Sequence, residues 1–519
     1  MNIILFSRDE GRPIQPVGVE LRARRYARAA VGGPAEAVIE ARGRGADLRG
    51  LLDWVGCGVE IWSAAGRPVW WGYISRVETP LAGGGGRWRA AADLEAMCNR
   101  AAAAYTRLEA GPGALGERGT TPWAEDAVSV AELGRKEELL ALAGATDQAA
   151  LAARDRFLAE RRFPTAALAA RRDWDDEPMA LLYCRGWWER LSWRFAAVPA
   201  QLALGVEAAG ALERAIGDGQ IAQLAQGFET TAAPLYAARV GVCARRVGQP
   251  VDALRLALYT TAENGSPGSL LASVTVAAEQ LSADFAWVEA DLLCPLTAGS
   301  SFFLVIGRTG AADAANGYAV RLNEPAGWGA GPLLAERAGW WYPYAGRLAF
   351  RMYENALVET SRQVQSLITA YGAGLGRVEV AVNSGIFTQS WRDGDSRARY
   401  EIEALLRIGT ANGRRMLAEV AADGGVRVYE QPAPDDGPYR LDAAGRFYDP
   451  SGQPVDPQDC PAGIWVLPQE MLDAGRLEVV TGWQAFFVER MLYEAASGAL
   501  ICSADGGGEP LTLVETGRW

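Results

Sequence analysis

The segment Cys57-Gly-Val-Glu-Ile-Trp-Ser-Ala-Ala-Gly-Arg-Pro-Val-Trp-Trp-Gly-Tyr-Ile-Ser-Arg-Val-Glu78 indicates the kind of fold that this chain adopts. Apolar residues alternate with other residues on either side of its middle, as they do in half-buried strands. These alternating positions are Val59, Ile61, Val69, Trp71 and Tyr73. Between them, Ala65-Gly-Arg-Pro68 supplies a turn, because Gly accepts a positive φ and Pro resists further pairing. The segment therefore predicts a β-hairpin from an aromatic-rich β domain.

The whole chain is long enough for several such domains. It has 519 residues, and domains usually contain roughly 100–200 residues, so about three to five domains are expected. Hydrophobic residues make up 49% and charged residues 22% of the chain, a composition typical of globular proteins that bury large cores. Short strand-like runs recur throughout, with fewer helical patterns between them. We expect a mainly β, multidomain protein with some α structure.

Histidine is absent from the sequence, which excludes several common forms of catalysis. Ser-His-Asp triads, Cys-His dyads and His-containing zinc sites all need it. The seven Cys are widely spaced and form no Cys-x-x-Cys pair, so they predict small buried side chains and not a zinc ribbon. Carboxylate-pair chemistry and all-oxygen cation sites stay open. We expect no cofactor and a non-enzymatic role.

The charge of the chain bears on its partners and on where it folds. The formal net charge is -12, and a groove that grips nucleic acid needs a basic surface, so specific DNA binding is not expected. The first ten residues, 1–10, become charged too early for a signal peptide. No apolar run approaches the ~18 residues that a membrane span needs. We expect the chain to fold in a cytoplasm and to have no membrane span.

Changes of composition and pattern divide the chain into six ranges. These are 1–107 (β-rich barrel), 108–195 (mixed α and β), 196–218 (linker rich in Ala and Gly), 219–353 (β-sandwich), 354–430 (α/β) and 431–519 (rich in Pro and Gly, then β). Helices are expected at 46–54, 123–133, 147–161, 355–371 and from a cap at Asp395 or Ser396 to Gly409. Strands are expected in the sandwich at 222–228, 237–243, 252–260, 270–276, 286–292, 301–307 and 347–353. Further strands are expected at 415–420, 426–429, 463–467, 476–480, 485–488 and 511–514.

Three groups of side chains are candidates for a site. Five aromatic residues lie in a loop region of the sandwich rich in Gly and Pro, where an exposed shelf would suit a sugar face or a partner, although we favour packing roles for them: Trp328, Trp340, Trp341, Tyr342 and Tyr344. Asp313, Asn316 and Glu324 could join a calcium site, although their spacing is not diagnostic and we favour solvated loop polarity for them. Asp393 and Asp395 form a close carboxylate pair, and we favour a turn and helix cap over catalysis for them.

Several segments, taken in order, resemble the frame of phage tail hub and baseplate hub proteins. The resemblance rests on the helix at 46–54 leading into the hairpin with Trp71-Gly-Tyr-Ile74, on Gly134-Arg-Lys-Glu-Glu138, on Gly186-Trp-Trp with Leu191-Ser-Trp-Arg194, on Trp391-Arg-Asp-Gly-Asp395 and on Asn412-Gly-Arg-Arg415. In the second of these, Leu133 stands where hub proteins commonly have Tyr. The resemblance implies two barrels, one from each end of the chain, that pair with each other, with an α/β domain between them.

The range 219–353 resembles a carbohydrate-binding-module-like jelly roll inserted into that frame. The segments that carry this likeness are Leu254-Arg-Leu-Ala-Leu-Tyr259, Asn264-Gly-Ser-Pro-Gly-Ser-Leu-Leu-Ala272, Leu296-Thr-Ala-Gly-Ser-Ser-Phe-Phe-Leu-Val305 and Leu348-Ala-Phe-Arg-Met-Tyr353. Modules of this kind occur on phage tails, on secreted enzymes and on adhesins. The likeness implies a domain that projects from the frame and touches a host glycan, a fibre or a neighbouring protein.

Together the two resemblances predict a structural protein of a phage or phage-derived tail tip. Its expected form is a homotrimeric ring that closes the distal tail tube, contacts a distal tail protein and anchors tip or fibre proteins, while DNA passes through the bore without specific binding. Its expected location is the virion, after assembly in the host cytoplasm. Two alternatives belong to other classes: a carbohydrate-active enzyme, which needs two Asp or Glu some 5–10 Å apart, and a lectin-like adhesin.

Overall fold

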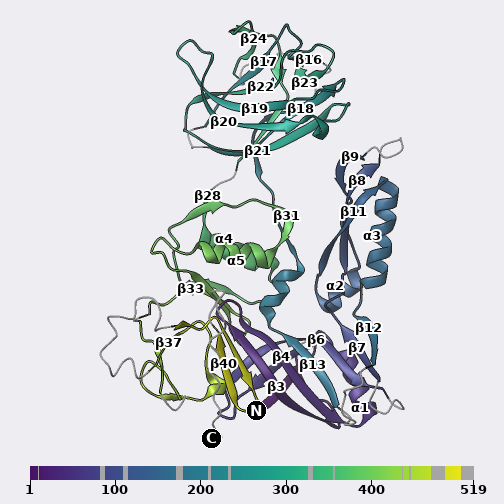
Figure 1. Cartoon of the computed structure of the whole chain (residues 1–519), viewed down its shortest axis with the longest axis vertical. Coiled ribbons are helices and arrows are strands. Elements are labelled where there is room, and N and C mark those ends of the chain that lie inside the picture. The colour runs from purple at the N-terminus through teal and green to yellow at the C-terminus, as the bar shows by residue number, and fades with distance from the viewer. Residues whose placement is uncertain are drawn as a thin grey trace.

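The computed structural model shows a mainly β, multidomain chain, as the sequence predicts. It describes residues 1–9, 11–81, 88–108, 115–170, 179–208, 212–231, 235–324, 331–354, 357–434, 436–442, 446–468 and 486–503. In Figure 1 a β-sandwich lies at one end, a helical layer lies in the middle, and a large sheet with both chain ends lies at the other end, with an α/β arm beside it. The strands expected at 476–480 and 511–514 lie outside the described residues.

The large sheet joins strands from distant parts of the sequence. Its main path runs β2-β1-β5-β6-β13-β4-β3-β39-β40, with β7 and β12 branching from β6. The strands are β1 (Asn2–Phe6), β2 (Pro13–Ile14), β3 (Val19–Ala29), β4 (Gly33–Gly43), β5 (Gly58–Trp62), β6 (Pro68–Pro80), β7 (Trp88–Asp93), β12 (Thr165–Ala170), β13 (Met179–Arg185), β39 (Arg490–Glu494) and β40 (Ala499–Ser503). The hairpin expected at 57–78 is confirmed as β5 and β6, and the helix expected at 46–54 as α1 (Gly45–Gly50) followed by a 3-10 turn, η1 (Leu51–Trp54).

The two ends of the chain share this sheet and its core. Strand β39 pairs antiparallel with β3 from Arg25 to Ala29, and β40 extends the sheet from β39. One hydrophobic cluster holds Tyr26 and Trp70 of the N-terminal part together with Met491 of the C-terminal part. A small C-terminal sheet packs on the same cluster; its strands are β34 (Tyr439–Leu441), β35 (Phe447–Tyr448), β36 (Pro454–Val455), β37 (Trp465–Pro468) and β38 (Phe486–Phe487), with η4 (Pro457–Asp459) beside it. Residues more than 400 positions apart in the sequence therefore fold as one unit.

Two glycines allow close backbone approaches at the centre of this sheet. A Cβ atom on Gly72 would lie 2.1 Å from the carbonyl oxygen of Arg185, and one on Gly186 would lie 1.7 Å from that of Pro34. Real Cβ atoms do not come this close to a backbone atom, so only Gly fits either position. The Gly of the Trp-Trp-Gly-Tyr strand and the Gly of the Gly-Trp-Trp segment thus serve packing between β6, β13 and β4.

The α/β layer lies between the large sheet and the sandwich (Figure 1). It contains α4 (Thr360–Tyr371), α5 (Ala398–Ile408), β29 (Val378–Val380), β32 (Met416–Val420) and β33 (Val426–Glu430). Gly372 and Gly409 end the two helices as expected, and the 415–429 hairpin is confirmed.

The cap expected for α5 at Asp395 or Ser396 is wrong. Asp395 lies in β31 (Arg392–Arg397), and α5 begins after Arg397. Pairing of β31 with β14 (Phe195–Val198) holds this segment extended, which overrides its capping residues. A second ladder, β28 (Leu357–Glu359) with β30 (Phe387–Gln389), precedes and follows α4.

The arm consists of a short sheet covered by one helix. Its strands are β8 (Arg100–Leu108), β9 (Leu115–Thr120), β10 (Ala124–Glu125) and β11 (Glu137–Ala145), and its helices are α2 (Ala127–Leu133) and α3 (Asp147–Arg161). The helix expected at 147–161 is confirmed as α3, and the hydroxyl of Thr146 caps it by accepting a hydrogen bond from the Ala149 amide. Tyr105 of β8 and Ala150 of α3 meet in a small core of their own.

The sandwich has two antiparallel sheets that enclose one large apolar core. One sheet contains β15 (Gln201–Val206), β16 (Leu212–Ile216), β18 (Leu235–Val247), β21 (Ala286–Leu296), β23 (Gly317–Asn323), β26 (Arg347–Leu348) and β27 (Phe350–Glu354); η3 (Ala278–Gln280) precedes β21. The other contains β17 (Gln223–Glu229), β19 (Ala253–Thr261), β20 (Pro267–Ala277), β22 (Ser301–Arg308), β24 (Leu333–Arg337) and β25 (Trp340–Pro343). The seven strands expected in this range are all present.

The linker expected at 196–218 is not a linker. It contributes β14 to the ladder with β31, and β15 and β16 to the sandwich. Ala and Gly give this stretch a low strand propensity, but its pairing with β27 and β23 decides the conformation. Because β15 and β27 are antiparallel neighbours, with Gln201 opposite Glu354, the chain enters and leaves the sandwich at one place. This arrangement is that of a domain inserted into a frame.

Replacing Gly72 by Ala tests the close approach in the large sheet. The added methyl group meets the Arg185 carbonyl, so we expect the variant to lose about 3 kcal/mol of stability through overpacking. Gly50→Ala is the matched control, because Gly50 has helical φ and ψ and nothing lies within 4 Å of its Cβ position. The control should be neutral or more stable by about 0.5 kcal/mol. Urea unfolding followed by tryptophan fluorescence measures both, and equal effects of the two substitutions would contradict the packing argument.

Candidate functional site: the interdomain junction and the aromatic edge

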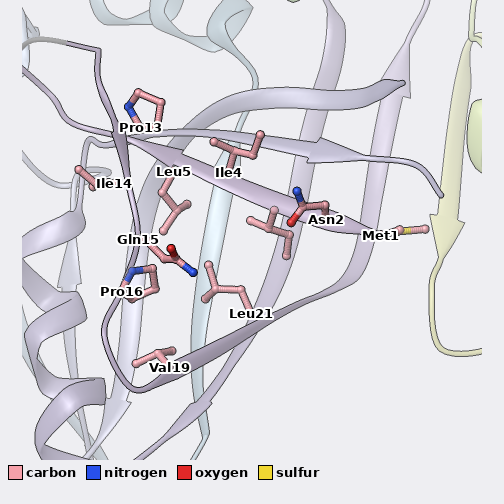
Figure 2. A pocket seen from close by; sticks show the side chains of 11 residues that line it. Met1, Asn2, Ile4, Leu5, Pro13, Ile14, Gln15, Pro16, Val19 and Leu21 are labelled. Carbon is pink, nitrogen blue, oxygen red and sulfur yellow. The ribbon is translucent and has the colours of Figure 1, made fainter. Parts of the chain in front are cut away.

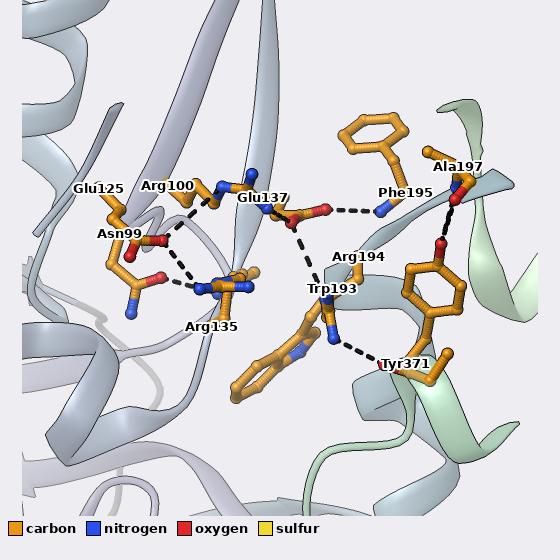
Figure 3. Close-up of polar contacts among 12 residues, drawn as sticks. Asn99, Arg100, Glu125, Arg135, Glu137, Trp193, Arg194, Phe195, Ala197 and Tyr371 are labelled. Atoms are coloured by element: carbon orange, nitrogen blue, oxygen red, sulfur yellow. Dashed lines mark hydrogen bonds and ion pairs between the residues drawn. The ribbon is translucent and has the colours of Figure 1, made fainter. Parts of the chain in front are cut away.

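A polar junction connects the arm, the large sheet and the α/β layer (Figure 3). It is built on the turn after α2, Gly134-Arg-Lys-Glu-Glu138, one of the segments that resemble hub proteins. The amide of Lys136 donates to Asn99 Oδ1 at 2.7 Å, and its Nζ donates to the carbonyl oxygens of Leu94 and Glu95, both at 2.6 Å. Burial lowers the pKa of Lys136 below its ordinary value. The only lysine of the chain thus connects the turn after α2 to the segment between β7 and β8.

Glu137 lies at the centre of the junction, with its side chain 4% exposed. Its carboxylate pairs with Arg100 of β8, accepts a hydrogen bond from the Phe195 amide at 2.8 Å, and lies 3.8 Å from Arg194. Arg194 in turn donates to the carbonyl of Ala370 at the end of α4. One buried carboxylate therefore connects the arm to the segment that leads into the α/β layer (Figure 3).

Two further residues, Arg397 and Tyr371, make contacts across the same junction. Arg397, just before α5, donates to the Glu137 carbonyl at 2.6 Å and pairs with Glu138 at 2.8 Å. The hydroxyl of Tyr371, at the end of α4, donates to the Ala197 carbonyl at 2.8 Å, and the Ala197 amide donates to that hydroxyl at 2.9 Å. These contacts fix the direction in which the chain leaves β14 for the sandwich.

An arginine held by aromatic rings lies beside the junction. The guanidinium carbon of Arg190 lies 4.9 Å from the ring centre of Tyr73, 4.6 Å from that of Trp187 and 5.0 Å from that of Trp193. Burial lowers the pKa of Arg190, and its Nε has no hydrogen-bond partner among the residues described here. Cation–π attraction therefore holds this side chain. The sequence does not predict this cation site, because no spacing rule brings Tyr73 near residues 187–193.

Three of the candidate aromatic residues, Trp340, Trp341 and Tyr342, lie in a strand, β25, and not in the loop that the sequence indicated. Ala338 and Gly339 have φ of 51° and 83° and form the tight turn between β24 and β25. On the edge strand β25, Trp340 is 71% and Tyr342 50% exposed, and the two positions share one face of the strand. These two side chains form the aromatic edge.

The remaining aromatic candidates are placed differently. Trp341 points to the opposite face of β25 from Trp340 and packs against Phe303, Val305 and Leu334 on the outer face of its sheet. Tyr344 packs against the sandwich core. Trp328 lies outside the described residues. The packing interpretation is thus confirmed for Trp341 and Tyr344, and a contact role stays open for the aromatic edge.

The candidate calcium residues do not form a cluster. Asp313 accepts hydrogen bonds from the Ala315 amide and from both the amide and side chain of Asn316, which makes a closed turn. Glu324 follows the far end of β23, which begins at Gly317, next to that turn. No group of three or more Asp, Glu or Cys side chains suited to a metal ion occurs in the described part of the chain. The interpretation as solvated loop polarity fits these three residues.

The contacts of Asp393 assign a structural role to one member of the carboxylate pair at 393 and 395. Asp393 pairs with Arg239 of β18 at 3.2 Å, and Arg239 also pairs with Asp291 at 2.7 Å. Asp393 of the α/β layer therefore contacts the sandwich, a role that the sequence did not indicate.

No helix within the described ranges is long and apolar enough to cross a membrane.

Comparisons with known proteins give little further guidance. No protein-family model and no curated protein matches the chain. Among solved structures, it is similar to the CBM22-1–GH10 modules of Clostridium thermocellum xylanase 10B, with 12% identity over 38% of this chain and 32% of that one, at a TM-score of 0.14. It is also similar to a Bacillus subtilis family 43 arabinoxylan arabinofuranohydrolase, with 9% identity over 60% of this chain and 69% of that one, at a TM-score of 0.16. A third similar structure is VP2 of infectious bursal disease virus, with 14% identity over 66% of this chain and 76% of that one, at a TM-score of 0.13. The chain spans about a third of the xylanase structure, and similarity at these scores supports no inference.

Replacing Glu137 by Gln tests the junction. The change leaves Arg100 and Arg194 without their shared anion at a buried position, so we expect a loss of about 3 kcal/mol of stability. Glu132→Gln is the matched control, because Glu132 pairs with Arg8 at a side-chain exposure of 45% and such pairs contribute less than about 1 kcal/mol. Calorimetric unfolding measures both, and a Glu137 variant that melts like the control would contradict the role of the junction.

Proposed function

We propose that this chain is a structural hub protein of a phage or phage-derived tail tip. In this role it forms a homotrimeric ring at the distal end of the tail tube, binds a distal tail protein and anchors tip or fibre proteins. It acts in the virion after assembly in the host cytoplasm, and DNA passes through the bore without specific binding. Its mechanism is structural, with no covalent chemistry.

The observation that carries this proposal is the sharing of one sheet and one core by the two chain ends, from β3 to β39. The resemblance to hub frames implies that N-terminal and C-terminal barrels pair, and an intervening domain then has to leave the frame and return to it. The adjacent strands β15 and β27, which lead into and out of the sandwich, fit such an inserted domain.

Contacts within the frame also give it the rigidity that a subunit of a ring needs. Glu137, Arg397 and Tyr371 fix the arm and the α/β layer against the segment that leads to the sandwich. A rigid connection of this kind transmits position from a ring to a projecting domain. Figure 1 places the sandwich at the opposite end of the chain from the large sheet, as a projecting domain requires.

The aromatic edge favours a second role for the sandwich, contact with a host glycan or a partner protein. Trp340 and Tyr342 are exposed neighbours on one face of an edge strand, and exposed aromatic rings stack on sugar rings and on protein surfaces. The enzyme alternative has no comparable support, because Asp393 is paired with Arg239.

Mass photometry and negative-stain imaging of the purified chain test the hub proposal. We expect particles of three chains, ring-shaped in projection, that bind the ends of isolated tail tubes. Since chains of net charge -12 repel one another less in salt, the trimer should be at least as abundant at high ionic strength. A chain that stays monomeric at all concentrations and ignores tube ends would refute the proposal.

A glycan array of host surface polysaccharides tests the aromatic edge. We expect Trp340→Ala with Tyr342→Ala to lower binding at least about tenfold, because two stacking rings are lost. The control is Leu293→Ala, which removes a side chain of similar exposure, 51%, from β21 in the other sheet. Equal binding by both variants, or none by the parent chain, would remove the glycan role and leave the hub proposal untouched.

A further inference from the structure

Two of the seven cysteines, Cys460 and Cys502, lie in the core that the two chain ends share. Both are 0% exposed. Cys502 belongs to β40 at the edge of the large sheet, and Cys460 follows η4 beside the small C-terminal sheet. The two residues enter one core from separate elements, so a bond between them would join those elements.

The segment that holds Cys460 is attached to the large sheet on both sides of that residue. At the first attachment, the Gln458 carbonyl accepts a hydrogen bond from the hydroxyl of Tyr26 in β3 at 2.5 Å. At the second, the Gly463 amide donates to the carbonyl of Val488, just before β39, at 2.8 Å. Cys460 is therefore held along β39 between these two attachments.

Cys502 lies at a level between the same attachments. Strand β39 pairs Tyr493 with Tyr26 of β3, at the level of the first attachment. On its other side, two residues nearer the second attachment, β39 pairs Met491 with Cys502 of β40. Turn η4 packs against β40, and the thiols of Cys460 and Cys502 share a hydrogen bond. Backbone and side chains thus bring the two thiols together.

We propose that Cys460 and Cys502 form a disulfide that fastens the small C-terminal sheet to β40 when the chain meets an oxidising environment. A disulfide stabilises a fold mainly by restricting the unfolded chain between its two cysteines. The time at which it forms rests on the proposed function, because a virion leaves the reducing cytoplasm in which its proteins fold. The pairing of these two thiols does not rest on that function.

The folded state keeps the pair from reacting quickly. Only a thiolate attacks a disulfide, and the hydrogen bond to Cys502 together with burial raises the pKa of Cys460 well above its ordinary value. A groove of about 450 Å³ between β1 and β3 reaches the same core from outside, but neither cysteine lines it (Figure 2). An oxidant therefore meets the thiols when the shared unit opens, and the disulfide forms as that unit closes again.

The oxidant that this step needs is a disulfide of low molecular mass, such as oxidised glutathione. One cysteine thiolate attacks it, which forms a mixed disulfide and releases one glutathione thiolate. The second cysteine thiolate then attacks the protein sulfur of the mixed disulfide, which forms the S–S bond and releases the other glutathione. The two protein sulfurs lose two electrons, and the two glutathione molecules that leave take up these electrons and the two thiol protons.

Incubation of the purified, full-length chain with oxidised glutathione tests the pairing. Alkylation of free thiols in denaturant, followed by mass spectrometry, should show two fewer alkylated groups among the seven cysteines and a Cys460–Cys502 peptide that reduction splits. Cys502→Ala should abolish this peptide. Cys243→Ala is the matched control, because it removes a cysteine of the sandwich that is only 6% exposed, and it should leave the peptide in place.

Hydrogen exchange of the same samples measures the effect on the fold. In the parent chain, amides of β40 should exchange at least about tenfold more slowly after oxidation than before, because the disulfide limits opening of the shared unit. Cys243→Ala should respond like the parent chain. Cys502→Ala should exchange equally with and without the oxidant.

Three results would overturn the proposal: no Cys460–Cys502 peptide after an incubation in which the β40 amides exchange, a disulfide between Cys460 and another cysteine, or equal exchange before and after oxidation. None of these results depends on the oligomeric state, so a monomeric chain that forms the disulfide would refute the hub proposal alone. Peptide mapping of isolated tails, prepared with a thiol-blocking reagent, tests the timing. The disulfide should be present there, and free thiols at both positions would contradict it.

Discussion

The antiparallel pairing of β39 with β3 is the constraint on which the rest of this structure depends. It brings residues 490–494 beside residues 25–29, and with them Met491, Leu500 and Cys502 into the core that Tyr26 and Trp70 also enter. Every segment between these two strands that is not part of the large sheet has to leave that sheet and return to it. The arm, the α/β layer and the sandwich are therefore excursions from one folded unit, and the antiparallel neighbours β15 and β27 show the largest of them beginning and ending at one point.

The segments that resemble hub proteins gain a physical meaning from their contacts. Gly72 and Gly186 allow backbones to approach where β6, β13 and β4 meet. The turn at 134–138 places Lys136 on two carbonyl groups and Glu137 between two arginines. These residues pack the strands of the frame or connect its parts. The segments that resemble hub proteins are therefore segments that make the frame rigid. The aromatic edge, in contrast, stays largely exposed in the described part of the chain, with Trp340 at 71% and Tyr342 at 50%.

Local patterns in the sequence predicted the elements well and their partners poorly. Alternation and turn residues located the hairpin β5–β6 and all seven expected sandwich strands, and Gly409 marked the end of a helix. Low-propensity strands were missed, because β15 and β16 are decided by neighbours far along the chain. Asp395 failed as a cap for the same reason, since β14 holds it in a strand. Of the candidate site, the sequence identified Trp340 and Tyr342, but the contacts of Glu137 and Asp393 span parts of the chain that no local pattern connects.

The central claim is that the two chain ends form one cooperative unit, and Met491→Ala tests it most directly. Met491 is 0% exposed in the shared core, so the substitution should cost about 3 kcal/mol. If the claim holds, hydrogen exchange of β3, β4 and β6 accelerates by the same factor as that of β39 and β40, because all of them open together. Faster exchange confined to β39 and β40, with β3 to β6 unchanged, would show that the C-terminal strands are an independent addition and would contradict the account.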